Sequence, residues 1–259
     1  MSVRLGPGDG GRILVHSFAG DDWQQCRDHV REKLDLASRR TSVTGGAELA
    51  ALAGVHADTT AFVKRLWHGS ERAAGTLVET YLRGRGMTCQ IPPTIRFLPR
   101  CFHRESGTSP PAMAAAVQGP SRQIVALVRT WLKADGGGKA AVTPVRKTLG
   151  SCRGGAVRLG LAANHMAVAE GIETALSVMQ ASGVTCWAAL GSNGLCALIL
   201  PPLPLASVVT IAADNDHTRT GIAAAHDAAA RWTAEGRTVR IALPPPGMDF
   251  NDLLCEGHQ

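Results

Sequence analysis

The chain has 259 residues, of which 45% are hydrophobic and only 4% aromatic, and its net charge at neutral pH is +6. This length suits two modest domains, and no apolar stretch reaches the roughly 18 residues of a membrane span. The seven cysteines are odd in number and never form a Cys-x-x-Cys pair, which argues against a disulfide framework and against structural zinc.

Charge and the start of the sequence bear on partners and location. The positive charge favours a polyanionic partner, although many basic proteins bind no nucleic acid. The first residues show no basic-then-apolar signal pattern, so we expect a cytoplasmic protein with no membrane partner.

The first 58 residues divide into two parts. Residues 11–18 (GRILVHSF) predict a strand, and residues 23–36 predict an amphipathic helix. Residues 37–58 are small, contain glycine and lack a periodic pattern. We interpret 1–36 as a small module and 37–58 as a linker.

Residues 59–160 combine helical and strand-like patterns with excess positive charge. Two helices are expected first, the second ending at the glycines of YLRGRG (81–86). Strand-like runs follow at 95–102 and 122–132, then a turn at 134–139. Basic residues dominate between positions 79 and 150 and include Arg85, Arg129, Lys139, Arg146 and Lys147. Such a strip would contact phosphates, and the alternative is a solvated basic face.

The last hundred residues alternate short apolar runs with helical patterns. The runs cover 166–169, 185–190, 208–213 and 238–243. This alternation predicts βαβ units and a small parallel sheet, and an α/β fold overall.

Acidic residues follow two of these predicted strands. Glu170 comes directly after the first, and Asp214 and Asp216 follow the third. Ligands bind outside the carboxyl ends of parallel strands, so we expect the three carboxylates to converge there. Crowded carboxylates need a hard cation, for which Mg²⁺ is the usual choice. The alternative is that the two aspartates cap the next helix.

Two further acids are candidates for the same cluster. Glu173 lies one helical turn after Glu170 and could hold a metal-bound water, or could serve as an N-terminal helix charge. Asp249, in the proline-rich segment before the C-terminus, either extends the cluster or is a turn residue.

Three motifs carry a family resemblance. AEGIETALS, AADNDHTRTGIAAA and GMDFNDLL resemble, in order, the motifs of a toprim domain, the Mg²⁺-binding fold of bacterial-type primases, topoisomerases and some nucleases. The match is closest to primase-like proteins of plasmids, phages and mobile elements. The resemblance implies a toprim catalytic domain over 161–259, a mainly parallel four-stranded sheet flanked by helices. It implies catalytic roles for Glu170, Asp214 and Asp216, and a metal site of these three with Glu173 and Asp249.

The resemblance extends to the rest of the chain. VHSFAGDD is similar to the second half of a primase zinc ribbon with Ser17 and Asp21 at the cysteine positions, which implies a degenerate remnant over 1–36. YLRGRG resembles the element that opens a primase core, and implies a basic α+β primase-core subdomain over 59–160. On this match Arg85, Arg129 and Lys147 correspond to residues that handle template or nucleotide phosphates, and Lys139 is a further basic candidate.

The resulting hypothesis is a Mg²⁺-dependent or Mn²⁺-dependent primase. Its partners would be single-stranded DNA, nucleoside triphosphates and a separately encoded replicative helicase. A topoisomerase would need a tyrosine nucleophile, and the only tyrosine, Tyr81, lies in a helical pattern outside the toprim segment. A toprim nuclease and a non-catalytic DNA-binding accessory protein of replication or mobilisation remain alternatives.

Overall fold

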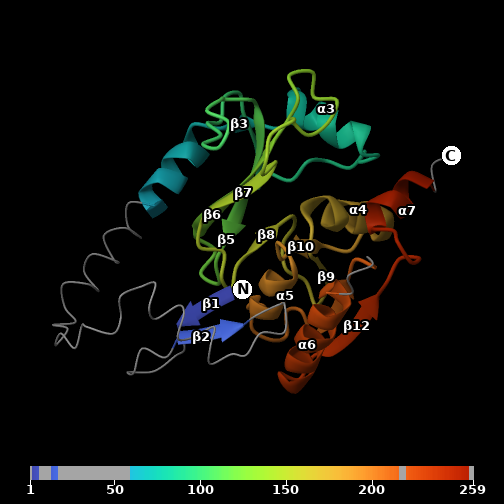
Figure 1. The fold of residues 1–259 in the computed structure, drawn as a ribbon. Helices are drawn as coiled ribbons and strands as arrows, with labels where there is room; N and C mark the ends of the chain where they lie inside the picture. The colour runs from blue at the N-terminus through green and yellow to red at the C-terminus, as the bar shows by residue number, and fades with distance from the viewer. Residues whose placement is uncertain (1, 6–12, 17–58, 216–219, 257–259) are drawn as a thin grey trace, which may run out of the picture. The chain divides into compact units, whose positions relative to one another are not determined.

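The computed structural model describes residues 2–5, 13–16, 59–215 and 220–256, and the chain forms two compact units, Met1–Leu52 and Ala53–Gln259 (Figure 1). In the first unit, β1 (Ser2–Leu5) pairs with β2 (Ile13–His16) in antiparallel fashion. β2 lies within the predicted strand. The helix predicted over 23–36, the linker over 37–58 and the ribbon positions Ser17 and Asp21 lie outside the described residues.

One ten-stranded sheet runs through the second unit. Its strands are β3 (Glu71–Arg72), β4 (Ile95–Leu98), β5 (Ala112–Gln118), β6 (Ile124–Trp131), β7 (Arg146–Gly150), β8 (Ala156–Arg158), β9 (His165–Ala169), β10 (Cys186–Ala188), β11 (Val208–Ala212) and β12 (Thr238–Ala242). The order is β12-β11-β9-β10-β8-β5-β4-β3, and β6 pairs with both β5 and β7.

β5 joins the two halves of this sheet. Its first four residues pair with β4, its last two pair with β8, and β6 pairs with it over its whole length. Neither β5 nor β8 was predicted from the sequence. β5 reads AMAAAVQ, and alanine has low strand propensity, while β8 has only three residues. Burial on both faces of β5 removes the apolar-polar alternation that marks a half-exposed strand.

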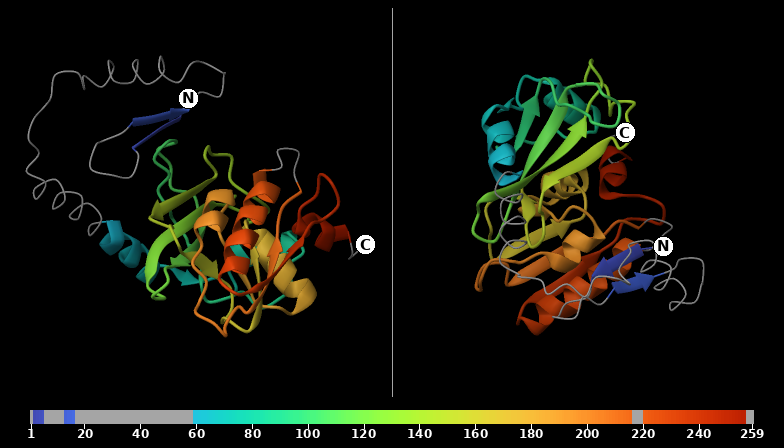
Figure 2. Two further views of the ribbon diagram at one scale, coloured as in Figure 1. Left: turned by 90° about the horizontal axis from the view of Figure 1, so that it is seen from below. Right: turned by 60° about the vertical axis from the view of Figure 1, so that its left-hand side comes forward.

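The C-terminal half contains the predicted parallel strands. β10, β9, β11 and β12 are mutually parallel, which confirms the mainly parallel four-stranded sheet. Helices α4 (Ile172–Ser182), α5 (Ser192–Ala197) and α6 (Thr220–Ala234) alternate with them. Met166 and Val168 of β9 pack with the residues of α5 and α6, whereas Ala167 and Ala169 pack with those of α4. The strands are therefore covered on both faces, as Figure 2 shows.

Three further helices complete the second unit. Residues 59–68 are helical, α3 covers Leu77–Gly84, and α7 covers Phe250–Glu256. The Thr76 side chain accepts a hydrogen bond from Val78 N at the start of α3, and the helix stops at the predicted glycines. α7 lies beside α4 (Figure 1). In the part of the chain that the structure describes, no helix is both long and apolar enough to cross a bilayer.

Candidate active site

The predicted acidic residues and several cations meet in one cavity of about 210 Å³, here called the acidic cavity. Its lining side chains come from the ends of β9 and β11, the start of α4, the segment before α7, the end of α3, the β6–β7 connection and β7. They are Arg85, Lys139, Arg146, Glu170, Glu173, Thr174, Asp214 and Asp249, with Gly171 and Gly191. The strand-end carboxylates Glu170 and Asp214 therefore lie together.

Glu170 is held at the end of β9 by the segment that follows β10. Its carbonyl accepts hydrogen bonds from Leu190 N (2.8 Å) and Gly191 N (3.1 Å). Ser192 Oγ donates to its Oε2 at 2.9 Å. Gly221, in the first turn of α6, lies so close to this carboxylate that a Cβ there would collide with Oε1. The carboxylate is buried and positioned from three elements.

Asp214 follows β11 and is half-buried. Thr174 Oγ1 of α4 lies 3.4 Å from its Oδ1 and donates to it. The next residue turns away from the cavity, because the Asn215 amide donates to Pro244 O at 2.8 Å. Asp216 lies outside the described residues.

Glu173 is buried and connects the two halves of the second unit. Its Oε1 accepts a hydrogen bond from Tyr81 Oη of α3 at 2.8 Å and lies 3.5 Å from Lys139 Nζ. Burial opposes ionisation of Glu173, but the attraction of Lys139 and the Tyr81 hydrogen bond outweigh it and hold its pKa below the ordinary value. Burial, followed by the charge of Glu173, raises the pKa of Tyr81. Glu173 is thus a carboxylate at neutral pH.

Asp249 has a clear structural role as well as its place in the cavity. Its Oδ1 accepts hydrogen bonds from Asn251 N and Asp252 N, both at 2.8 Å, so it is the N-cap of α7. The Asp252 carboxylate accepts from Asp249 N in return, at 3.1 Å, which resembles a capping box.

Two amide side chains hold the turn that carries Arg85. Asn251 of α7 donates to Arg85 O at 2.7 Å and to Ser177 Oγ at 3.1 Å. Gln180 of α4 accepts from Thr88 N and Cys89 N and donates to Gly86 O. The turn after α3 is therefore fixed against α4 and α7 by hydrogen bonds.

The predicted basic residues divide between two faces of the sheet. Thr130 of β6 pairs with Arg146, which lines the acidic cavity, and Arg129 pairs with Lys147. Because side chains alternate along a strand, Arg129 and Lys147 face the opposite side. There Arg129 lies 5.2 Å over the ring of Trp131, and Lys147 forms an ion pair with Glu105. The structure brings Arg85 and Lys139 to the acids but not Arg129 or Lys147.

Sequence reasoning did not single out Arg146, Thr174, Ser192 or Tyr81 as site residues. Arg146 was one basic residue among many. Only the pairing register of β7 shows that Arg146 and Lys147 lie on opposite faces of the sheet. Ser192 directly follows Gly191 after β10, and Thr174 lies in the first turn of the helix after β9, positions that could have singled them out. Tyr81 was expected to be a packed helix residue, and it is buried, but its hydroxyl donates to Glu173, which lines the acidic cavity.

Oxygen donors in the acidic cavity suit a hard cation. Glu170 and Asp214 offer carboxylates at adjacent strand ends, which is the donor set that Mg²⁺ uses together with phosphate oxygens and water. Within 59–215 and 220–256, no three acidic, histidine or cysteine side chains are grouped closely enough to hold a metal by themselves. The two carboxylates therefore fit a hard cation, and the third candidate ligand, Asp216, lies outside the described residues.

Two family models match adjacent parts of the second unit. Residues 165–259 match a model described as a toprim domain. The C-terminal part of this chain is a toprim domain. Residues 57–159 match a model described as a domain of unknown function, DUF7146. The toprim domain contributes Glu170, Glu173, Asp214 and Asp249 to the acidic cavity, and the DUF7146 region contributes its three cations.

Solved structures show that both regions together adopt a primase-like fold. A DNA primase domain from Pseudomonas aeruginosa aligns with a TM-score of 0.50 and 15% identity, over 76% of this chain and 74% of that one. A DnaG catalytic core aligns with a TM-score of 0.52 and 14% identity, over 76% and 75%. At such identities the likeness concerns the fold. No curated protein matches the sequence significantly.

Proposed function

We propose that this protein is a Mg²⁺-dependent primase-type nucleotidyltransferase that makes short oligonucleotides on single-stranded DNA. The observation that carries the proposal is the acidic cavity, where toprim carboxylates face three cations of the preceding region. Nucleotidyl transfer needs both kinds of group, because the triphosphate must be held while charge moves to the leaving pyrophosphate.

Glu170 and Asp214 would hold the metal through their carboxylate oxygens, with Asp216 as a further donor implied by the motif. When bound, Mg²⁺ (or Mn²⁺) would neutralise phosphate charge and favour ionisation of the attacking hydroxyl. Ser192 and Thr174 restrict the two carboxylates by hydrogen bonds, so that little reorganisation is needed when substrate arrives.

Arg85, Lys139 and Arg146 would contact the triphosphate from the opposite wall of the acidic cavity. Arg146 is exposed and Lys139 has 44% of its side chain exposed, so both reach solvent beside the acids. The ionised Glu173 holds Lys139 near the reaction centre, and Tyr81 in turn holds Glu173. In this proposal Glu173 positions a phosphate-binding lysine, whereas the family resemblance implied a metal role for it.

The natural partners in this proposal are single-stranded DNA, nucleoside triphosphates and a separately encoded helicase. Replication of a plasmid, phage or other mobile element is the biological setting that the motif resemblance implies.

The test is incubation of the purified protein with single-stranded DNA, Mg²⁺ or Mn²⁺ and labelled nucleoside triphosphates, beside Asp214→Ala. We expect a ladder of short products from the wild type and none from the variant. Metal-dependent shortening of the DNA would instead assign a nuclease. DNA binding without either activity would assign a non-catalytic accessory protein.

A further inference from the structure

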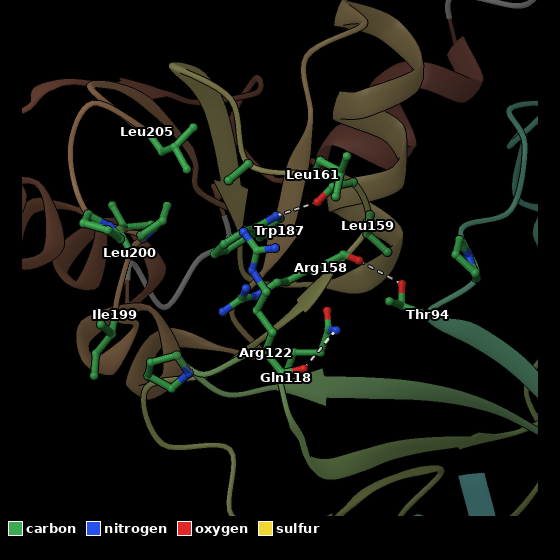
Figure 3. Close-up of a pocket in the computed structure, with 16 residues that line it drawn as sticks. Thr94, Gln118, Arg122, Arg158, Leu159, Leu161, Trp187, Ile199, Leu200 and Leu205 are labelled. Carbon is green, nitrogen blue, oxygen red and sulfur yellow. Dashed lines mark hydrogen bonds between the residues drawn. The ribbon is translucent and has the colours of Figure 1, made fainter. Parts of the chain in front are cut away.

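A second cavity, of about 600 Å³, lies where β5, β8 and β10 meet the segment after α5 (Figure 3). We call it the arginine pocket. It shares no lining residue with the acidic cavity. Its walls are mostly apolar and include Leu159, Leu161, Trp187, Ile199, Leu200 and Leu205.

Two guanidinium groups lie in this apolar surrounding. Arg158 stacks on Trp187, 4.3 Å from the ring centroid, and one of its terminal nitrogens donates to Gly119 O at 2.7 Å. Its Nε is buried and has no hydrogen-bond partner among the described residues. Arg122 lies in the β5–β6 turn, and Figure 3 shows it in the same part of the pocket.

The pocket contains positive charge without a counter-charge. No acidic residue lines it, and no ion pair within the described ranges involves Arg122 or Arg158. Burial, followed by repulsion from Arg122, lowers the pKa of Arg158. Arg158 is half-buried and Arg122 is exposed, so an anion that enters the pocket meets two guanidinium groups and no competing carboxylate.

The rim of the pocket exposes large apolar side chains. Leu161 is 85% exposed and Ile199 is 51% exposed, and both belong to the lining. Exposed apolar groups that gather around a pocket, unlike isolated ones, mark contact with another molecule. The ligand should therefore carry apolar surface as well as negative charge.

Three other polar side chains of the pocket already donate hydrogen bonds to backbone carbonyls of the protein. Thr94 Oγ1 donates to Arg158 O, the Gln118 amide donates to Arg122 O, and the Trp187 N–H donates to Gly160 O. A nucleotide would need such groups for its base edges and ribose hydroxyls. A peptide segment with a large apolar side chain beside a carboxylate needs only the apolar walls and the arginines.

We propose that the arginine pocket docks an acidic, hydrophobic peptide segment of a partner protein, with a carboxylate on Arg122 and Arg158 and an apolar side chain against Leu161 and Ile199. The charge complementarity and the apolar rim carry this inference, and it does not depend on the proposed catalytic activity.

The test is fluorescence anisotropy of the full chain with a labelled peptide Gly-Ser-Asp-Asp-Leu-Phe that has a free C-terminus. Matched peptides replace either the two aspartates by asparagines with an amidated end, or Leu-Phe by Ser-Gly. We expect binding of the first peptide only. Arg122→Glu and Leu161→Ser should each weaken it by about tenfold or more, since each removes a group that the proposal assigns to the peptide. Arg240→Glu, an exposed charge reversal on β12 outside the pocket, should leave it unchanged.

Three results would overturn the proposal. One is that the folded wild-type protein does not bind the first peptide at millimolar concentration. The variants count only if their thermal unfolding curves match that of the wild type. Another is binding that Arg122→Glu does not weaken. The third is displacement of the peptide by ATP or oligo(dT) in the wild type, which would assign the pocket to nucleotides or to a DNA strand.

Discussion

At Glu173, burial and charge act in opposite directions, and the neighbouring groups decide the outcome. A buried carboxylate alone would prefer its neutral form, yet Lys139 and the Tyr81 hydroxyl keep this one ionised. The single tyrosine of the chain is thus a hydrogen-bond donor to a carboxylate, and its raised pKa keeps it a donor at all physiological pH.

Tyr81→Phe should lower the free energy of unfolding by about 1.5–3 kcal/mol at neutral pH, because a hydrogen bond to a buried charged group is lost. The folded-state pKa of Glu173 lies below its ordinary value of 4.5, so its contribution to stability is present above that value and is lost as pH falls through the folded pKa. The difference between wild type and variant should therefore be largest near neutral pH and shrink below about pH 4.5. Urea unfolding at a series of pH values measures it, and a difference that is constant with pH would contradict the assignment.

Substitutions of Asp249 can distinguish its role as the N-cap of α7 from a role as a charged group in the acidic cavity. Asn is as good an N-cap as Asp, whereas Ala is worse by about 1 kcal/mol. We expect Asp249→Asn to keep wild-type stability and Asp249→Ala to lose about that amount. Because Asp249 lines the acidic cavity, both variants should lose activity by about tenfold. Full activity in Asp249→Asn would show that the residue serves only as the cap of α7.

At the scale of elements, Arg85 is positioned where the end of α3 packs against α4 and α7. Asn251 of α7 and Gln180 of α4 bind the backbone of the turn after α3, which lies far away in sequence. The segment that resembles the third toprim motif therefore contributes to the acidic cavity in two ways. Asp249 lines the cavity, and Asn251 holds the backbone of Arg85, which also lines it.

Asn251→Ala should destabilise the protein by about 1–3 kcal/mol, because the buried Asn251 amide loses its hydrogen bonds to Arg85 O and Ser177 Oγ. The nucleotide KM should rise more than kcat falls, since a phosphate-binding residue is displaced while the carboxylates stay in place. Leu253→Ala, on the exposed side of the same helix, is the control and should change neither. Equal effects of the two substitutions would contradict a specific role for the amide.

At the scale of the whole second unit, one sheet joins the toprim domain to the DUF7146 region. β8 pairs with the toprim strand β10 on one side and with β5 on the other. The two faces of β6 and β7 have different surroundings, because Arg146 lines the acidic cavity on one face and Arg129 lies over the ring of Trp131 on the other.

The adjacent residues Arg146 and Lys147 test this division in a matched pair. Arg146→Gln should raise the nucleotide KM by about tenfold, because a charge-assisted contact to phosphate is lost. Lys147→Gln should leave that KM within about twofold, since it removes only an exposed ion pair with Glu105. If Lys147 contacts the template as the resemblance implies, its substitution should weaken DNA binding alone. Steady-state kinetics and DNA titration distinguish the two, and a KM effect in Lys147→Gln would contradict the assigned faces.

The amino-acid sequence by itself determined the parallel strands, the helices between them and the convergence of Glu170 and Asp214. These features depend on short apolar runs and on residues next to them in the chain, so local patterns suffice. Only the tertiary structure decided that the alanine-rich β5 is a strand, that β8 connects the two halves of the sheet, and that Arg146 rather than Lys147 lines the acidic cavity. Such features depend on burial between distant segments and on strand register, and a shift of one residue in register turns every side chain to the other face. The same holds for Tyr81 and Glu173, which are 92 positions apart and meet because α3 packs against the toprim domain.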